Sequence, residues 1–389
     1  MTTARPTEEM AAGLDQAGAD LARLHALSDQ KPRLIPSLRD LGAIQPWLSE
    51  AAAALSADRS EVAAEWIVDN AYLVDRAVTQ TIEDMPRGRY RQLPALAVDN
   101  TWCPPRVYAI AHGLLDATHI QLTVRSITRF VSGYQQADVL ELAELWALPT
   151  MLRLACVETL VEAAVRLSPQ LEAPFPLTTK PDVSLELDET ERVARSIRCL
   201  ATLATMSWTS FVETTSVIDE ILLDDPSSTY GRLDPETRNR YRRTVEDLAR
   251  RSHHSEQEVA RRVLARARQA RPGSRAGHVG YWLMAEGCRP LERSLRYRPS
   301  LDDRSRNLVR RYPTFVYLGT LLVLTVCLAL FPVLMLVPPG TSWFVTAAVV
   351  GIAALPASNP ALTILNWLIS TLLPPAVLPK LDFDLGIPS

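Results

Sequence analysis

Two long stretches without a charged residue lie close to the C-terminus of this chain of 389 residues. The first, Phe315–Val337, contains 23 residues. The second, Trp343–Leu373, contains Pro356 and Pro360. A helix of about 20 apolar residues is long enough to cross the hydrocarbon core of a bilayer. We therefore predict a transmembrane hairpin over residues 312–374, whose second arm is either one kinked span or two half-helices.

A buried helical hairpin inside a soluble protein is the alternative interpretation of these stretches. A soluble helix of this length normally shows one polar face. Neither stretch contains a charged residue to form such a face. We therefore favour the bilayer as the partner of this region.

The charges that flank the hairpin predict its orientation. Arginines precede the first stretch at positions 304, 306, 310 and 311, and Lys380 follows the second. The connecting segment 338–342 has no charge. Basic residues are retained on the cytoplasmic side of a membrane, and the start MTTARPTEEM lacks the pattern of a secretory signal. We expect a multi-pass protein with residues 1–311 and both ends of the hairpin in the cytosol.

The sequence before the hairpin predicts an all-α fold. Residues 60–84 combine an apolar stripe at helical spacing with charges on the other side. Asp234 followed by Pro235 is a helix start signal, and Ser255 with Glu258 has the form of a capping box. Asp188 with Glu191 and Ser210 with Glu213 have the same form. The predicted helices in this part are 189–205, 210–223, 235–252 and 256–270.

The domain organisation follows from these helices and from a segment rich in proline. Residues 168–187 read SPQLEAPFPLTTKPDVSLEL, which is typical of a linker. The predicted parts are a helical N-terminal segment (1–57), a first helical subdomain (58–167), the linker (168–187), a second, basic helical subdomain (188–311), the transmembrane hairpin (312–374) and a juxtamembrane segment (375–389).

Charge is distributed unevenly along the chain. Residues 1–189 contain 16 Lys and Arg against 26 Asp and Glu, a balance of −10, whereas residues 190–311 contain 24 against 16, a balance of +8. Anionic lipid attracts basic segments beside a membrane. The basic part therefore either faces the membrane surface or receives the acidic part of the same chain.

We assign no catalytic, cofactor-binding or metal-ligating residue from the sequence. The adjacent His253 and His254 have no zinc-ligand spacing around them and fit a helix junction. Arg87, Arg89 and Arg91 have the charge to hold a phosphate, but a solvated or ion-paired face fits them better. The acidic motif Asp382-Phe383-Asp384 resembles a metal-binding motif, but the nucleotide-binding sheet that normally carries such a motif does not precede it.

Eleven arginines between positions 238 and 271 raise nucleic-acid binding as a possible function. Acidic residues are interleaved with them, and the sequence shows no nucleic-acid-binding fold. Ion-paired helix surfaces beside an anionic membrane explain the arginines better. We therefore expect no nucleic-acid partner.

Several blocks of sequence, taken in order, resemble the N-terminal region of the cyclic β-1,2-glucan synthase family. The resemblance covers about residues 60–389, and no single block would be specific. The blocks are AAEWIVDNAYLVDRAV (63–78), MPRGRYRQLPAL (85–96), PRVYAIA (105–111), ELWALPTMLRLACVE (144–158), SWTSFVETTSVIDEILLDDPSSTY (207–230), TRNRYRRTVEDLARRS (237–252), GHVGYWL (277–283) and LPKLDFDLGIPS (378–389).

This resemblance implies a part of a very large enzyme of the bacterial inner membrane. Members of the family are glycosyltransferases that use UDP-glucose with a divalent metal ion. Their glycosyltransferase domain follows a membrane hairpin like this one, so the resemblance implies that domain as a partner, in cis or in trans. No catalytic motif of the family has a matching position here.

The resemblance has local departures, and it leaves two functions open. The segment HGLLDATHIQLT lacks the polar, glycine-containing turn that the family leads us to expect, and TWCPPRVY has an additional proline and cysteine. The first function is the cytosolic and membrane-anchoring part of a synthase, not catalytic by itself. The alternative is a stand-alone membrane-tethered helical scaffold or interaction protein.

Overall fold

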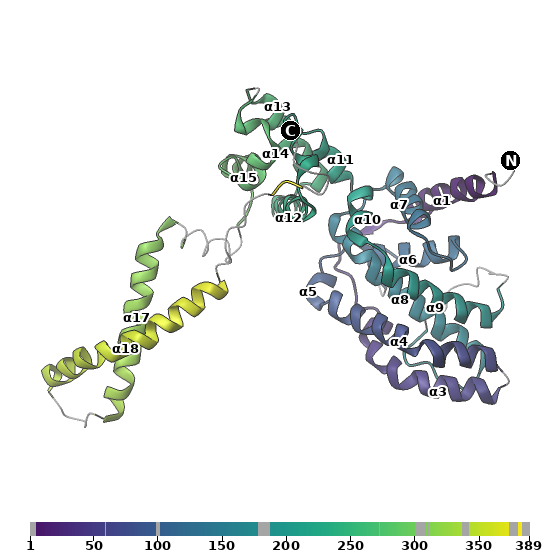
Figure 1. The fold of residues 1–389 in the computed structure, drawn as a ribbon, viewed down its shortest axis with the longest axis horizontal. Helices are drawn as coiled ribbons and strands as arrows, with labels where there is room; N and C mark the ends of the chain where they lie inside the picture. The colour runs from purple at the N-terminus through teal and green to yellow at the C-terminus, as the bar shows by residue number, and fades with distance from the viewer. Residues whose placement is uncertain are drawn as a thin grey trace.

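A computed structural model shows a chain built from helices (Figure 1). The structure describes residues 5–58, 60–98, 102–177, 187–271, 273–299, 309, 311–336, 342–372 and 380–382. The only sheet among these residues is the short antiparallel pair of β1 (Leu27–Ser28) and β2 (Ala95–Leu96). The all-α prediction is confirmed.

The first helical body is organised around α8 (Leu142–Leu167). Side chains are buried on every side of this helix, from Leu145 to Ala164. A helix that is apolar all round must be enclosed by other helices. The enclosing helices are α4 (Glu61–Asp84), α6 (Arg106–Ala117) and α9 (Glu189–Thr205). The other elements of this body are α1 (Arg5–Leu24), α2 (Pro36–Arg39), η1 (Leu41–Ala43), α3 (Ile44–Ala57), α5 (Arg87–Tyr90) and α7 (Val124–Ala137).

Helix α9 follows the predicted linker but packs against the helices that precede it. It lies along both α8 and α4 (Figure 1). Its ends match the predicted range 189–205. The domain boundaries stay predictions, but the helices on the two sides of residues 168–187 share one core.

The second helical body lies between the first body and the hairpin (Figure 1). It consists of α11 (Val217–Leu223), η2 (Tyr230–Arg232), α12 (Pro235–Ser252), α13 (Glu256–Gln269), η3 (Arg275–Gly277), α14 (Val279–Met284) and α15 (Cys288–Leu295). Helix α10 (Trp208–Thr215) connects the bodies, because it packs against α7 and α8 and leads directly into α11.

The helix start signals had mixed success. The side chain of Asp234 accepts a hydrogen bond from the backbone N–H of Thr237, and Ser255 accepts one from Glu258, so these two of the four predicted N-caps are confirmed. The side chain of Asp188 makes no capping hydrogen bond, and Ser210 lies inside α10 rather than at its start. The single helix predicted over 210–223 is wrong. Ser216 interrupts it, because its hydroxyl accepts a hydrogen bond from the N–H of Asp219 and starts a new helix.

The two uncharged stretches form α17 (Pro313–Leu336) and α18 (Trp343–Leu372), which pack against each other. Helix α18 is one continuous helix that includes Pro356 and Pro360, so it is not divided into two half-helices. Serine and threonine hydroxyls donate to carbonyls in the same region, for example Ser358 to Leu355. Such bonds help membrane helices to tolerate proline.

Candidate membrane interface

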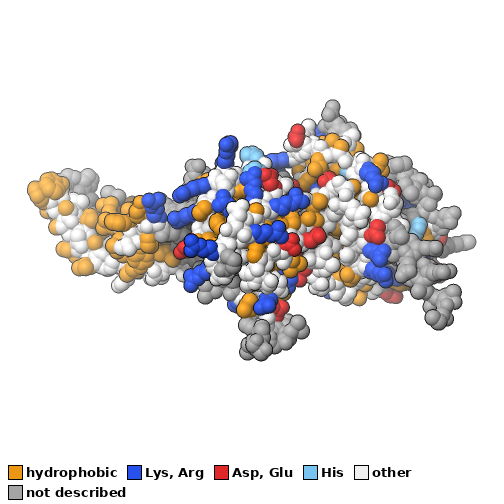
Figure 2. Space-filling view, turned by 90° about the horizontal axis from the view of Figure 1, so that it is seen from above, with side chains coloured by type: hydrophobic (Ala, Val, Ile, Leu, Met, Phe, Trp, Pro, Cys, Tyr) orange, Lys and Arg blue, Asp and Glu red, His pale blue; other side chains and the backbone are white. Residues whose placement is uncertain are grey.

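The outer surface of the hairpin is apolar (Figure 2). Two segments are long and apolar enough to cross a membrane, 313–331 with a mean hydropathy of 2.3 and 343–371 with 1.6. Only 6% and 17% of these windows are buried in the fold, whereas the core helix of a soluble protein is mostly buried. Exposed side chains include Phe315, Leu318, Leu322, Phe331, Met335, Trp343, Phe344, Ile352, Leu355 and Trp367. Such a surface requires an apolar surrounding.

Two alanines and a leucine are buried where α17 and α18 pack together. Ala329 and Ala361 are completely buried, and Leu365 is nearly so. Small residues allow the backbones of membrane helices to approach closely, where van der Waals packing takes the place of the hydrophobic effect. The hydroxyl of Tyr317 lies 3.4 Å from Oδ1 of Asn366. The hairpin therefore has one face on which its two helices pack together and an apolar outer face that is available to lipid.

The segment that follows the hairpin returns to the N-terminal end of α12. Leu381 forms an antiparallel bridge with Leu233. The N–H of Asp234 donates to the carbonyl of Lys380 at 3.1 Å, and the N–H of Asp382 donates to the carbonyl of Arg232 at 2.8 Å. The chain leaving the membrane is thus bound to the residues that start α12.

The segment that leads toward the hairpin is bound to the other end of α12. The hydroxyl of Tyr297 donates to Asp247 at 3.1 Å. The N–H of Arg298 donates to the carbonyl of Arg251 at 3.2 Å. The two segments that flank the hairpin are thus bound to opposite ends of α12.

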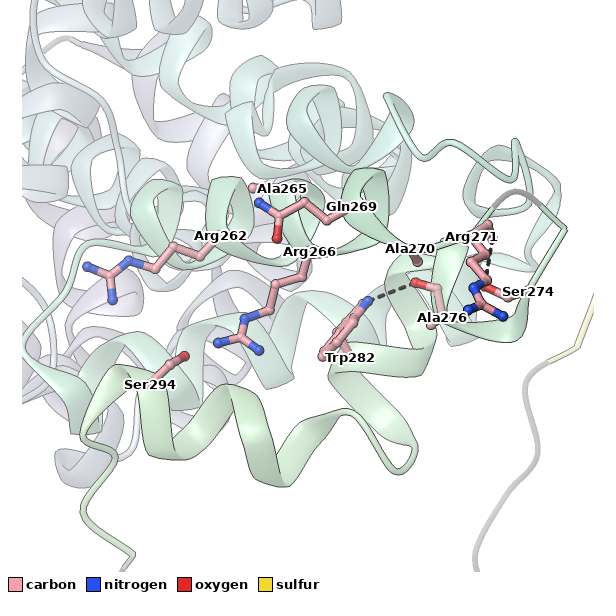
Figure 3. Close-up of a pocket in the computed structure, with 10 residues that line it drawn as sticks. All are labelled: Arg262, Ala265, Arg266, Gln269, Ala270, Arg271, Ser274, Ala276, Trp282 and Ser294. Carbon is pink, nitrogen blue, oxygen red and sulfur yellow. Dashed lines mark hydrogen bonds between the residues drawn. The ribbon is translucent and has the colours of Figure 1, made fainter.

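Arginine side chains gather on the second helical body next to the hairpin (Figure 2). One group lines a groove of about 750 Å³ between α13 and α15. Arg266 extends from α13 toward α15, and the indole of Trp282 lies beside it (Figure 3). The guanidinium carbon of Arg266 lies 5.3 Å from the centre of the Trp282 ring. Arginine beside tryptophan is a common combination at membrane–water interfaces.

Many of the arginines of this body are ion-paired. At least seven of the eleven between positions 238 and 271 have a carboxylate partner: Arg238, Arg240, Arg242, Arg250, Arg251, Arg262 and Arg268. Ion-paired helix surfaces are the interpretation that the sequence favoured. The absence of a nucleic-acid partner stays a prediction.

The histidine pair has a structural place at a helix junction. His253 ends α12 in the left-handed conformation, with a φ of 58°. Nδ1 of His254 lies 3.0 Å from a carboxylate oxygen of Glu258 at the start of α13. Within the described part of the chain, no group of three His, Cys, Asp or Glu side chains is arranged to hold a metal ion.

Two other candidates from the sequence are the acidic motif, which is only partly described, and three arginines, which are all exposed. Asp382 belongs to the returning segment, and Phe383 and Asp384 lie outside the described residues. Of the three arginines of α5 and its C-terminal cap, Arg89 is among the residues that line a cavity between the two bodies, together with Trp146 and Trp208. Arg87 and Arg91 are not among those lining residues.

The sequence did not reveal the buried hydrogen-bond network that holds α14 and its Trp282. Burial alone would raise the pKa of Asp225, but hydrogen bonds with His278 and Ser227 outweigh it and hold the pKa at about 2. Asp225 also accepts from the N–H of Val279 at 3.1 Å. A Cβ atom at Gly280 would lie 2.2 Å from the Tyr241 hydroxyl, which explains the glycine in GHVGYWL.

Comparison with known proteins identifies a relative of this chain. No protein-family model matches it. The cyclic beta-(1,2)-glucan synthase NdvB of Rhizobium meliloti (strain 1021) is 28% identical over an alignment of 399 positions, which covers 84% of this chain and 14% of that protein. The chain thus spans about one seventh of the length of this relative. The resemblance predicted from the sequence blocks is confirmed: the chain is related to the cyclic β-1,2-glucan synthases.

Proposed function

We propose that this chain is the N-terminal, cytosolic and membrane-anchoring part of a cyclic β-1,2-glucan synthase and is not catalytic by itself. The observation that supports an anchoring role is the attachment of both hairpin flanks to α12. A glycosyltransferase domain, in cis or in trans, supplies the transfer of glucose from UDP-glucose with a divalent metal ion.

The proposed location is the bacterial inner membrane, with both helical bodies in the cytosol. The arginine-rich second body next to the hairpin supports this orientation, because basic residues stay on the cytoplasmic side and bind anionic lipid. The uncharged connection between α17 and α18 then faces the periplasm.

Cysteine labelling in cells tests the orientation. In a Cys327→Ala background, Ser342→Cys places a thiol before α18, and Lys380→Cys places one on the returning segment. We expect an impermeant maleimide to label the first variant in intact cells and the second only after lysis. Labelling of Lys380→Cys in intact cells would contradict the orientation.

Reconstitution tests the anchoring role. The chain alone, in lipid vesicles with UDP-glucose and Mg²⁺, should make no glucan. Adding a separately produced catalytic region of a synthase should give more membrane-bound glucan synthesis with the full chain than with residues 1–299. Glucan synthesis by the chain alone would refute its non-catalytic role, and equal synthesis with both forms would refute its anchoring role.

A further inference from the structure

A cavity of about 670 Å³ lies between the first and second helical bodies. Its walls come mainly from α8 and α12. On α12 the lining residues are Asn239, Arg242, Arg243, Glu246, Asp247 and Arg250, and on α8 they include Trp146, Thr150 and Arg153. In both helices these positions recur at intervals of three and four and so share one face. The size is typical of small-molecule sites.

One deeply buried wall residue has unused hydrogen-bonding capacity. Arg242 is only 1% exposed. Its Nε donates to Asp219 at 2.6 Å, but its two terminal nitrogens have no hydrogen-bond partner among the described residues. One of these terminal nitrogens lies 3.3 Å from Glu213 as an ion pair, and the other has no such neighbour in the described part of the chain. A buried guanidinium left in this state costs free energy unless another group pairs with it.

Two further buried polar groups on the same cavity are also incompletely paired. Arg153 is 8% exposed, and its Nε has no partner within the described residues, although another nitrogen donates to Asp84 at 2.9 Å. The amide oxygen of Asn239 is buried and likewise has no partner there. The cavity therefore presents several unsatisfied donors and one acceptor.

The charges on the cavity favour an anion. Five arginines line it against three acids. Asp84 is already paired with Arg153, and Asp247 is paired with Arg250 and Arg251. Burial raises the pKa of Glu246, the remaining acid, which also lies 4.0 Å from Arg250. Arg89 and Arg243 have no carboxylate partner among the described residues, so positive charge remains for a ligand.

Two indole rings indicate that the ligand is more than an inorganic ion. Trp146 and Trp208 both line the cavity and are only partly buried. Aromatic side chains stack on the flat rings of ligands, and the paired N–H groups of a guanidinium match the oxygens of a phosphate. We propose that this cavity binds a small organic phosphate, with its phosphate on Arg242, Arg153 and Arg243 and its ring against a tryptophan.

Calorimetric titration of the full chain in detergent tests this proposal with three simple probes: phenyl phosphate, inorganic phosphate and phenol. We expect phenyl phosphate to bind most tightly, inorganic phosphate more weakly, and phenol not measurably. No binding of phenyl phosphate, or equal binding of phenol, would overturn the proposal. Equal affinity for phenyl phosphate and inorganic phosphate would overturn the proposed contact between the ligand's ring and a tryptophan.

Matched variants locate the binding to this cavity. Arg243→Gln removes an exposed charge on the wall without touching the core, and it should weaken phenyl phosphate about tenfold. Trp146→Leu should weaken phenyl phosphate but leave inorganic phosphate unchanged. Arg261→Gln, an exposed arginine of α13 outside the cavity lining, is the control and should have no effect. An equal loss in Arg261→Gln would overturn the assignment, and thermal melts of each variant verify folding.

Discussion

Two buried arginines lie at the junction of the helical bodies, and their surroundings differ. Every guanidinium nitrogen of Arg106 has a partner: Nε donates to Glu144 at 2.8 Å, and the terminal nitrogens donate to Glu144, Asp138 and the carbonyl of Val139. Arg242 is equally buried but has two terminal nitrogens without hydrogen bonds to described residues. The first arginine completes the fold with protein groups alone, whereas the second leaves room for a ligand.

The two cavities at this junction also differ, in the charge of the side chains that line them. The cavity beside Arg106, of about 630 Å³, is lined by Glu141, Glu246 and Glu256. Burial and the neighbouring carboxylates raise the pKa of Glu141 to about 7 and that of Glu256 to about 8. The cavity beside Arg242 has arginines in excess. One side of the junction should therefore respond to pH and the other to anions.

The largest effect is expected from breaking the complete network. Arg106→Ala leaves the fully buried Glu144 without its partner, which should lower the free energy of unfolding by about 3–5 kcal/mol. Chemical denaturation of the variant measures it. Arg129→Ala, which removes a half-exposed pair with Asp15, is the control and should cost less than about 1 kcal/mol. An equal loss of unfolding free energy in Arg106→Ala and Arg129→Ala would contradict the distinction between buried and surface ion pairs.

Breaking the incomplete network should cost less. Arg242→Met removes the ion-pair partner of the buried Asp219, which keeps its hydrogen bond from Tyr230, so the free energy of unfolding should fall by about 3 kcal/mol, the lower end for a broken buried pair. Added phenyl phosphate should raise the melting temperature of the native chain and not that of the variant. A variant that is stabilised as much as the native chain would show that Arg242 does not hold the phosphate.

The acidic side predicts a pH dependence of stability. The pKa of Glu256 rises from 4.5 to about 8 on folding, so the folded state binds the proton more tightly. Its stabilising contribution is complete below about pH 4.5 and is lost as pH rises toward 8. The titratable and basic side chains around it are Glu141, Glu144, Glu246, Arg106, Arg250 and His254.

Glu256→Gln should flatten this pH profile. Glutamine retains an oxygen that accepts the N–H of Leu142, now at 2.9 Å, but cannot ionise. Between pH 5 and 8, we expect the free energy of unfolding of the native chain to fall by roughly 2 kcal/mol more than that of the variant. This value corresponds to only part of the pKa shift of Glu256. Melting temperatures across this range measure the difference. Parallel profiles of the two proteins would contradict the role of Glu256.

The smallest effect is expected where the two cavities meet. Arg250 lines both of them, but its side chain is 44% exposed and pairs with Asp247 and Gln92 at the surface. Arg250→Gln should change stability by less than about 1 kcal/mol. A much larger loss would mean that the two sides of the junction act as one network.

The sequence predicted those features that depend on neighbouring residues. Asp234-Pro235 and Ser255 marked the starts of α12 and α13, because a cap acts within one helical turn. The uncharged runs predicted both hairpin helices, because the length of an apolar stretch is also a property of consecutive residues. The break at Ser216 was missed, and Ser210 was mistaken for a helix start, although α10 begins two residues earlier at Trp208.

The cavity and the flank attachments were beyond sequence reasoning. Arg242 and Arg153 are far apart in the chain, and their shared wall exists only because α12 crosses α8. Spacing along α12 would have shown that Asn239, Arg242 and Arg243 share a face. It would not have shown whether that face meets solvent, a carboxylate or a cavity.

The attachment of both hairpin flanks to α12 makes that helix a spacer between them. A helix of 18 residues is about 27 Å long, far more than the 8–10 Å between the axes of two packed helices. The two attachments lie at opposite ends of α12, so the length of this helix sets how far apart the two flanking segments are where they leave the second helical body.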